Sequence, residues 1–289
     1  MPAATLLRGF RSHVAEIGGR RTRYWVAGDG PPVVLVHGLG GAAVNFADLA
    51  PLLARRHRVL VLDLPGHGGS EPLRELDGLG DLADHVAATV EREGMLPAAV
   101  VGYSMGGVVA LRLAVSRPED VAALALVAPA GIVSQTRRAQ IWLTVAAALR
   151  PAGLVALVRD AIARRPNLRV PVFGYWGAQD PRALTPRSVL GFLQAQREHT
   201  DVRRAATALL RDDPRPDLDR VGCPALLVWG ARDHLIPLAD GFEYARRLRC
   251  PIRVVPAAGH LIVGEYPAET AAILETFLQG VTAEASAAS

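Results

Sequence analysis

Five consecutive residues, Gly102 to Gly106 (Gly-Tyr-Ser-Met-Gly), have the types and spacing of a site for a nucleophile. An apolar run, residues 98–101, precedes them, and an apolar helical stretch, residues 108–115, follows them. A sharp turn between a strand and a helix exposes a serine beside a possible base, and small flanking residues let strand and helix approach closely. We therefore predict that Ser104 is a nucleophile. The alternative is a serine that begins a helix after an ordinary glycine-rich turn.

Two later loops offer the base and the acid that a serine nucleophile needs. Asp233 comes shortly after the apolar run 226–229, and His260 comes shortly after the expected strand at residues 252–255. The carboxyl ends of parallel strands meet at one edge of a sheet, which would bring these side chains to Ser104. The serine would attack, His260 would take up and return its proton, and Asp233 would orient the imidazole and stabilise its charge. The alternatives are an aspartate that closes a turn and a histidine at the surface.

A glycine-rich loop, His37 to Gly41, is the candidate for an oxyanion hole. It directly follows residues 33–36, a continuous apolar run typical of a strand buried on both faces. The backbone N–H of Leu39 would act together with that of Met105, the residue after the serine. Donors of this kind lower the barrier by roughly 3–4 kcal/mol each. The alternative is a plain turn between a strand and a helix.

Six residues near these loops, or in the segment before Asp233, are predicted to contact a substrate. They are His37, Gly38, Tyr103, Trp142, Phe173 and Trp176. The aromatic side chains among residues 173–176 would form either a lid over the site or a simple hydrophobic anchor. Apolar side chains in this segment would line a pocket for an acyl group.

Apolar strand runs alternate with amphipathic helical stretches, which predicts an α/β protein with a mostly parallel sheet covered on both faces. Residues 12–17 and 21–27 alternate as in two strands, and Gly18-Gly19 predicts a hairpin between them. Helices are expected at about residues 45–55, 79–93, 238–248 and 267–279. The small, polar residues 282–289 are expected to be disordered.

The alternation stops between residues 131 and 220, where helical stretches are broken by prolines. We expect one discontinuous core domain, residues 1–130 and 221–289, with residues 131–220 as a helical cap. Residues 131–219 contain 14 arginines against 8 acidic residues, whereas the whole chain has a net charge of +4. The basic character therefore lies in the predicted cap. The arginines either form a solvated surface or attract an anionic substrate or an acyl carrier.

Composition limits the other functions that the chain can have. Half of the residues are apolar, but the apolar stretches are shorter than a membrane span, and the first 13 residues lack the apolar region of a signal peptide. Two cysteines are too few for a zinc site or a disulfide scaffold, and no nucleic-acid-binding motif occurs. We expect a cytoplasmic protein that acts on a small molecule, without a metal, a cofactor, a nucleic acid or a membrane span. The oligomeric state is not indicated.

Together these motifs resemble the α/β-hydrolase superfamily. The matching stretches are residues 37–40, 63–70, 102–107, 230–233 and 259–260. The resemblance implies the α/β-hydrolase fold, an eight-stranded, mostly parallel sheet flanked by helices, with a helical cap inserted after the sixth strand. It also implies a serine hydrolase, because relatives that open epoxides or displace halides have an aspartate at the position of Ser104.

The resemblance leaves several reactions open. The leading expectation is hydrolysis of a carboxylic ester with a small or medium apolar acyl group, through an acyl-enzyme. Carbon–carbon bond hydrolysis of a meta-cleavage product, thioester cleavage and a lyase reaction are alternatives. Many carbon–carbon hydrolases carry a tryptophan where this chain has Leu261, and similar lyases of menaquinone synthesis carry an arginine where it has Val108. A ligand sensor that has lost turnover is the non-enzymatic alternative.

Overall fold

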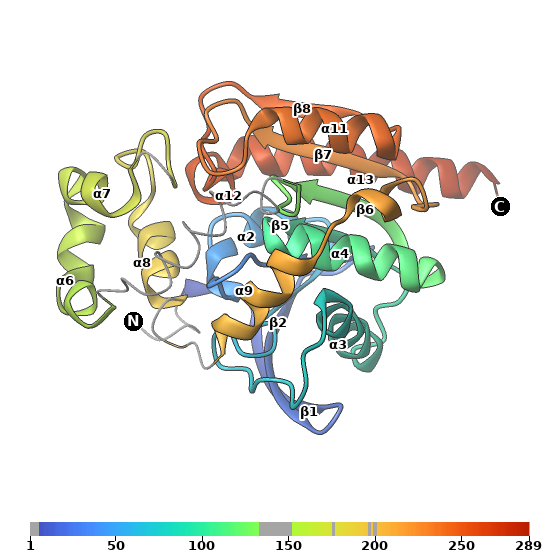
Figure 1. The fold of residues 1–289 in the computed structure, drawn as a ribbon, viewed down its shortest axis with the longest axis horizontal. Helices are drawn as coiled ribbons and strands as arrows, with labels where there is room; N and C mark the ends of the chain where they lie inside the picture. The colour runs from blue at the N-terminus through green and yellow to red at the C-terminus, as the bar shows by residue number, and fades with distance from the viewer. Residues whose placement is uncertain (1–5, 133–151, 175–176, 196–197, 199–200, 289) are drawn as a thin grey trace.

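The computed structural model describes residues 6–132, 152–174, 177–195, 198 and 201–288 (Figure 1). In this part of the chain, eight strands form one sheet with the order β1-β2-β4-β3-β5-β6-β7-β8. The strands are β1 (Arg11–Ile17), β2 (Arg20–Ala27), β3 (Pro32–Val36), β4 (Arg58–Leu62), β5 (Ala98–Tyr103), β6 (Val121–Val127), β7 (Ala225–Gly230) and β8 (Ile252–Val255). β2 pairs antiparallel with β1 and with β4, and every other pair is parallel. The predicted α/β fold class is confirmed.

The first two strands form the predicted hairpin. Gly18 and Gly19 connect them with φ angles of 55° and 72°. Glycine adopts this left-handed conformation without a clash of a Cβ atom, and two such residues in succession suit the right-handed twist of a hairpin. The hairpin forms one edge of the sheet and adds its two antiparallel strands beside β4.

β3 shows why the central strands are apolar at every position. Val33 and Leu35 face one hydrophobic core, and Val34 and Val36 face the other. All four are at most 1% exposed. Side chains alternate between the two faces of a strand, so a strand covered on both faces buries every residue.

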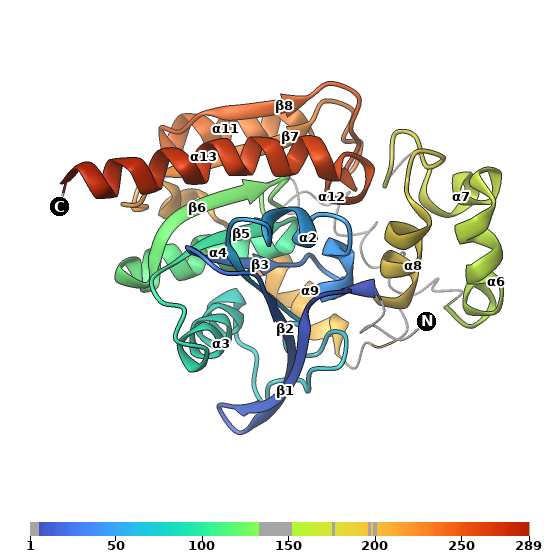
Figure 2. The ribbon, with the colours of Figure 1, turned by 180° about the vertical axis from the view of Figure 1, so that it is seen from behind.

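Helices cover both faces of the sheet (Figures 1 and 2). On one face lie α3 (Leu79–Arg92), α4 (Met105–Ser116) and α11 (Leu238–Leu248), which share one hydrophobic core. On the other face lie α2 (Ala50–Leu53) and α13 (Pro267–Ala288), which share the second core. Single turns at η1 (Ala43–Phe46), η2 (Pro118–Asp120) and α12 (Ile262–Glu265) complete the connections.

Two expected elements differ in the structure. The helix expected at 45–55 is instead the two short turns η1 and α2, and Pro51 lies in the first turn of α2. Proline has no N–H and is tolerated at the start of a helix, not inside it. The expected disorder at 282–289 is wrong up to Ala288, because α13 continues through this alanine-rich end. Neither α13 nor any other helix in the described residues is long and apolar enough to cross a membrane.

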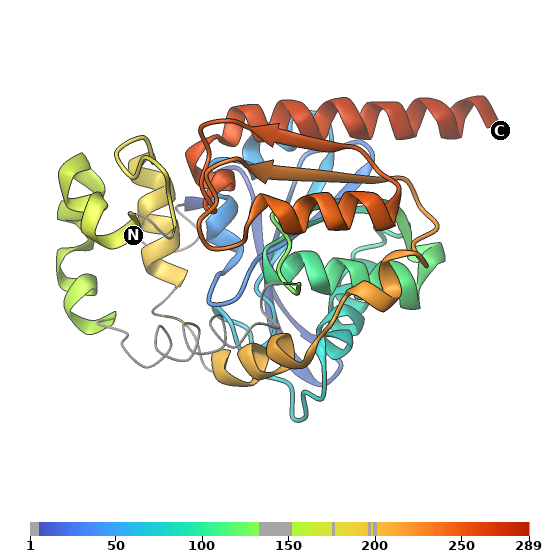
Figure 3. The same cartoon turned by 45° about the horizontal axis from the view of Figure 1, so that its top comes forward.

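Between β6 and β7, the regular elements that the structure describes are all helices. They are α6 (Ala152–Arg164), α7 (Pro166–Phe173), α8 (Pro186–Ala195), α9 (Val202–Arg211) and α10 (Arg215–Leu218). Figure 3 shows α6, α7 and α8 beyond the carboxyl ends of β7 and β8. A Cβ atom at Gly191 of α8 would lie 2.3 Å from the carbonyl oxygen of Val44, so α8 packs closely on η1. We propose that residues 131–220 form a cap on the core of residues 1–130 and 221–289.

Candidate active site

Ser104 lies at the sharp turn between β5 and α4. Its φ and ψ angles are 55° and −123°, a conformation that costs a residue with a side chain about 1–3 kcal/mol. Three backbone hydrogen bonds hold it there. The Ser104 N–H donates to Val127 O at 3.0 Å, and Ser104 O accepts from the N–H groups of Gly107 at 2.9 Å and Ala130 at 3.1 Å. The surrounding backbone therefore imposes the strained turn that presents the serine.

Glycines around the serine are required because backbone atoms lie against them. A Cβ atom at Gly106 would lie 2.2 Å from Val36 O, and one at Gly102 would lie 2.3 Å from Gly106 O. A Cβ atom at Gly38 would lie 2.9 Å from the Cβ atom of Ser104. These distances are shorter than van der Waals contact. The Gly-x-Ser-x-Gly spacing thus lets α4 and the loop after β3 pack directly on the turn.

The structure brings Ser104, His260 and Asp233 together in one hydrogen-bonded chain. Ser104 Oγ lies 3.1 Å from His260 Nε2, and His260 Nδ1 lies 2.7 Å from Asp233 Oδ2. The Asp233 side chain is fully buried, and its Oδ1 accepts from the N–H groups of Leu235 at 2.9 Å and Ile236 at 2.8 Å. An ionised carboxylate only accepts, so Nδ1 carries the proton and Nε2 can accept the serine hydroxyl. This is the arrangement that activates a serine.

Tyr103 contacts His260 rather than open space. Its hydroxyl donates to the backbone carbonyl of His260 at 3.0 Å, and the ring centroid lies 5.3 Å from that of the imidazole. Burial raises the pKa of Tyr103 well above its usual value, so the phenol stays a donor. The residue is only 4% exposed. It was predicted as a substrate contact, but its hydroxyl holds the backbone of the histidine.

His37 orients the peptide group that carries the Leu39 N–H. The Leu64 N–H donates to His37 Nε2 at 3.0 Å, so the ring proton is on Nδ1. This Nδ1–H donates to Gly38 O, with Nδ1 2.8 Å from the oxygen. Gly38 O also accepts from the Gly41 N–H at 3.0 Å. In a trans peptide the C=O and N–H point in opposite directions, so the Leu39 N–H points away from the His37 ring. His37 is completely buried, which leaves it no surface for the predicted substrate contact.

Asp63, directly after β4, holds the start of η1, the turn that follows the loop of residues 37–41. Its Oδ1 accepts from the Ala43 N–H at 2.8 Å, its Oδ2 accepts from the Gly69 N–H at 2.9 Å, and Arg23 Nε lies 2.6 Å from Oδ2.

The other donor predicted for the oxyanion hole, the Met105 N–H, belongs to the first residue of α4 and has no acceptor within the helix. The positive end of the helix dipole reinforces this donor.

The three aromatic residues predicted in the cap have different outcomes. Phe173 is 6% exposed and packs edge-on against Phe192 of α8, with ring centroids 6.3 Å apart. It therefore joins α7 to α8 as a hydrophobic anchor. Trp142 and Trp176 lie outside the described residues.

Glu265 is a functional candidate that sequence reasoning missed. The residue is 7% exposed, and its carboxylate accepts from the N–H groups of Gly259 at 2.9 Å, Gln179 at 2.7 Å and Asp180 at 3.3 Å. Burial raises its pKa to about 7, with a further contribution from the nearby carboxylate of Asp233. The only signal in the sequence is an acidic residue directly after an apolar run, Leu261 to Val263 and Gly264.

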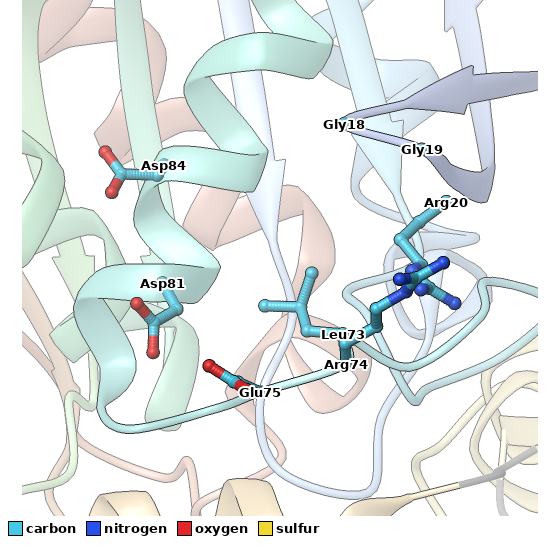
Figure 4. A pocket seen from close by; sticks show the side chains of 8 residues that line it. All are labelled: Gly18, Gly19, Arg20, Leu73, Arg74, Glu75, Asp81 and Asp84. Carbon is cyan, nitrogen blue, oxygen red and sulfur yellow. The ribbon is translucent and has the colours of Figure 1, made fainter.

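A surface hollow of about 460 Å³ lies away from these residues, between the β1–β2 turn and the start of α3. Figure 4 shows Arg20 and Arg74 on one side of it and Asp81 and Asp84 on the other. The full lining is Gly18, Gly19, Arg20, Leu73, Arg74, Glu75, Asp81 and Asp84. It contains none of the hydrogen-bonded chain around Ser104. Within the described part of the chain, no group of His, Cys, Asp and Glu side chains could hold a metal ion.

Comparison with curated proteins identifies relatives with acyl chemistry in their names. The chain is 35% identical over 257 residues to the dihydrolipoyllysine-residue acetyltransferase component of the acetoin cleaving system of Pseudomonas putida, which covers 86% of this chain and 64% of that protein. The chain thus spans less than two thirds of that relative's length. It is 36% identical over 221 residues to the pimeloyl-[acyl-carrier protein] methyl ester esterase of Chromobacterium violaceum, which covers 76% of this chain and 83% of that protein.

Comparison with solved structures gives the same fold. A membrane phospholipase A, described as a bacterial virulence factor, aligns with a TM-score of 0.74 and 26% identity over 97% of this chain and 89% of that one. An enol-lactonase from Burkholderia xenovorans LB400 aligns with a TM-score of 0.73 and 23% identity over 92% and 100%, a likeness of fold alone. A family model for the alpha/beta hydrolase fold matches residues 31–267. The chain belongs to the α/β-hydrolase family.

Proposed function

We propose that the protein is a serine-dependent hydrolase of carboxylic esters. The observation that carries the proposal is the continuous hydrogen-bonded chain from Ser104 through His260 to Asp233, with the serine on a strained turn at the start of a helix. A serine hydroxyl is a weak nucleophile and needs a base oriented by a third group. This arrangement supplies both.

The proposed reaction has two halves. Ser104 Oγ attacks the ester carbonyl while His260 Nε2 takes its proton, and the N–H groups of Leu39 and Met105 stabilise the oxyanion. His260 then gives the proton to the departing alcohol, which leaves an acyl group on Ser104. Water then attacks the acyl carbon while His260 takes its proton. The bond from the acyl carbon to Ser104 Oγ breaks, His260 returns the proton to Ser104 Oγ, and the acid is released. Asp233 stabilises the imidazolium in both halves.

An ester of a small or medium apolar acyl group is the substrate class that we propose. The Chromobacterium violaceum relative is named for a methyl ester of an acyl group, and the Pseudomonas putida relative is named for acetyl transfer. Carbon–carbon cleavage and a lyase reaction have less support, because Leu261 and Val108 occupy positions where relatives with those activities often carry tryptophan and arginine. The hydrogen-bonded Ser104 and His260 also argue against a sensor without turnover.

The cap gives a reason to consider a charged substrate. Arg164 and Arg165 are exposed at the junction of α6 and α7, in the segment with the excess of arginines. A local positive field attracts anionic ligands and raises their rate of association. We propose attraction of an anionic acyl substrate, of which an ester on an acyl carrier protein is one kind. A solvated basic surface is the alternative.

A panel of p-nitrophenyl esters of increasing acyl length tests the proposed reaction. Wild type should release p-nitrophenol, and Ser104→Ala should lose turnover while keeping the circular dichroism spectrum of the wild type. Ser116→Ala, an exposed serine at the other end of α4, is the matched control and should retain full activity. Turnover that persists in Ser104→Ala would contradict the proposal. Selective loss of a meta-cleavage dienoate would instead favour carbon–carbon hydrolysis.

A further inference from the structure

The loop that carries His260 is fastened to the cap segment 177–180 on both sides of the histidine. After the histidine, the Leu261 N–H donates to Gly177 O at 2.9 Å. Before the histidine, the Gly259 N–H donates to Glu265 Oε2 at 2.9 Å. The other oxygen of the same carboxylate accepts from Gln179 and Asp180 of the cap segment. Glu265 is therefore the side chain that joins the two segments.

The contact between the two segments is close and continues into the cap. A Cβ atom at Gly259 would lie 2.6 Å from the backbone nitrogen of Gln179, so the backbones touch. The Ala178 N–H donates to Phe173 O at 2.8 Å, which ties the segment to the end of α7. Backbone and side-chain contacts thus run from α7 through residues 177–180 and Glu265 to the loop of His260.

The three N–H donors need an ionised carboxylate. An ionised Glu265 only accepts, and its two oxygens can serve all three donors, whereas protonation places an O–H group among them. The titratable groups that interact with this carboxylate are Asp233 after β7, Tyr103 at the end of β5 and Tyr266 directly before α13. Asp180 contributes its backbone N–H. Burial and Asp233 oppose ionisation, and the backbone N–H groups favour it.

We propose that Glu265 is a positioning residue for the ester hydrolysis proposed above, on which this inference rests. Its ionised carboxylate ties the cap segment 177–180 to Gly259 and so holds His260 within reach of Ser104. Glu265 does not touch the reacting atoms. It acts through the backbone on either side of the histidine, and it couples the position of the cap to the base of the reaction.

Activity should then depend on two protonation states at once. His260 must be neutral to accept the serine proton, and Glu265 must be ionised to hold the loop. When two groups must both be deprotonated, kcat/KM falls by more than tenfold, and at the limit by about a hundredfold, for each pH unit on the acid side. A single essential group gives a fall of tenfold per unit. The acid limb of the wild-type pH profile therefore distinguishes one group from two.

Glu265→Gln tests the inference with a side chain of the same size. The amide has one oxygen, so its NH2 group must face either Gly259 or the cap N–H groups. We expect kcat at about pH 8 to fall roughly 10- to 100-fold, the cost of a small misplacement of a catalytic group, with KM little changed. The acid limb of this variant should become tenfold per unit. Glu269→Gln, an exposed glutamate four residues further on, should keep the wild-type kcat and steepness.

The measurements use p-nitrophenyl esters, and samples held at about pH 5 are returned to about pH 8 to show that the protein stays folded. A wild-type acid limb of only tenfold per unit would overturn the inference, even if Glu265→Gln failed to fold. Unchanged kcat and steepness in Glu265→Gln would also overturn it. Both results leave ester hydrolysis intact as long as turnover needs Ser104. Turnover that survives Ser104→Ala would instead overturn the proposed function, and this inference with it.

Discussion

The two oxygens of Asp233 have different partners, and this makes an amide at this position informative. Oδ1 is held by the N–H groups of Leu235 and Ile236, and Oδ2 faces His260 Nδ1. In Asp233→Asn the two N–H groups keep the oxygen, so the NH2 group must face the imidazole. The histidine then carries its proton on Nε2, which cannot accept from Ser104. We expect kcat to fall by about 10⁴-fold, measured with p-nitrophenyl esters.

Asp219→Asn, an exposed aspartate before β7, is the control and should retain activity. Removal of the base in His260→Ala should cost several orders of magnitude. Adding Asp233→Asn to that variant should cost little more, because residues that act as a unit are not additive. Near-wild-type turnover in Asp233→Asn would show that another carboxylate orients His260.

Sequence motifs predicted the residues that form the hydrogen-bonded chain, because each lies in a short local pattern after a strand. Motifs did not predict the direction of neighbouring side chains. Tyr103 and His37 were expected to face a substrate, but their polar atoms are bound to His260 O and to Leu64 N and Gly38 O. Glu265 was missed because two of its N–H partners lie more than 80 positions away in the chain.

At the scale of elements, the approach of α4 to β3 depends on Gly106. A Cβ atom there would meet the backbone carbonyl of Val36 at 2.2 Å, and a backbone group in a central strand cannot move aside. Gly106→Ala should therefore lower the free energy of unfolding by about 1–3 kcal/mol, the usual cost of overpacking. It should also reduce turnover, since α4 carries Met105.

Urea unfolding measures the change, and Gly80→Ala in α3 is the matched control. A Cβ atom at Gly80 would meet nothing within 4 Å. Its substitution should leave stability unchanged or raise it by up to about 1 kcal/mol. Equal stability of Gly106→Ala and wild type would contradict the packing described between α4 and β3.

The contact between α3 and β2 should make stability depend on pH. His85 is buried against Thr22, with Nε2 2.8 Å from Oγ1, and burial lowers its pKa from 6.5 to about 4. Between these values the unfolded chain binds more protons than the folded one. The stabilisation that neutral His85 gives is therefore fully present above pH 6.5 and is lost as the pH falls to 4. This loss lowers the free energy of unfolding by about 3 kcal/mol.

His85→Gln removes this titration, so the free energy of unfolding should fall less steeply on acidification than in the wild type. His234→Gln, at an exposed histidine, is the matched control. Comparison with the wild type is needed because Glu265, whose pKa is raised, makes the free energy of unfolding fall as the pH rises from 4.5 to 7. Identical slopes in His85→Gln and wild type would show that His85 titrates normally.

Element positions followed from the apolar pattern where burial is complete, as in residues 33–36 of β3 and in β5. The predicted positions were wrong where a proline or a run of alanines, rather than burial, determines the extent of a helix. The region 45–55 contains apolar residues at helical spacing, but Pro51 restricts the helix to a single turn. The end of α13 is rich in alanine, which has the highest helix propensity, and the helix continues there to Ala288.

At the scale of the whole molecule, the excess of positive charge lies in residues 131–219, which we propose form the cap. Replacing Arg164 and Arg165 with glutamine should lower kcat/KM for an anionic ester roughly tenfold at low salt, with the loss shrinking as salt screens the field. A neutral ester should be unaffected. Arg55 and Arg56, an exposed pair before β4, give a matched double variant that should change neither substrate. Equal losses for charged and neutral esters would indicate a packing role.

Covalent labelling tests the central claim, that Ser104 is the nucleophile of a serine hydrolase, most directly. A fluorophosphonate reacts with a serine that a neighbouring base activates, and intact-mass and peptide mass spectrometry locate the adduct. The wild type should gain one adduct, on the peptide that contains Ser104, and His260→Ala should label far more slowly. Ser104→Ala should gain none. An adduct that persists in Ser104→Ala, or that maps to another residue in the wild type, would contradict the account.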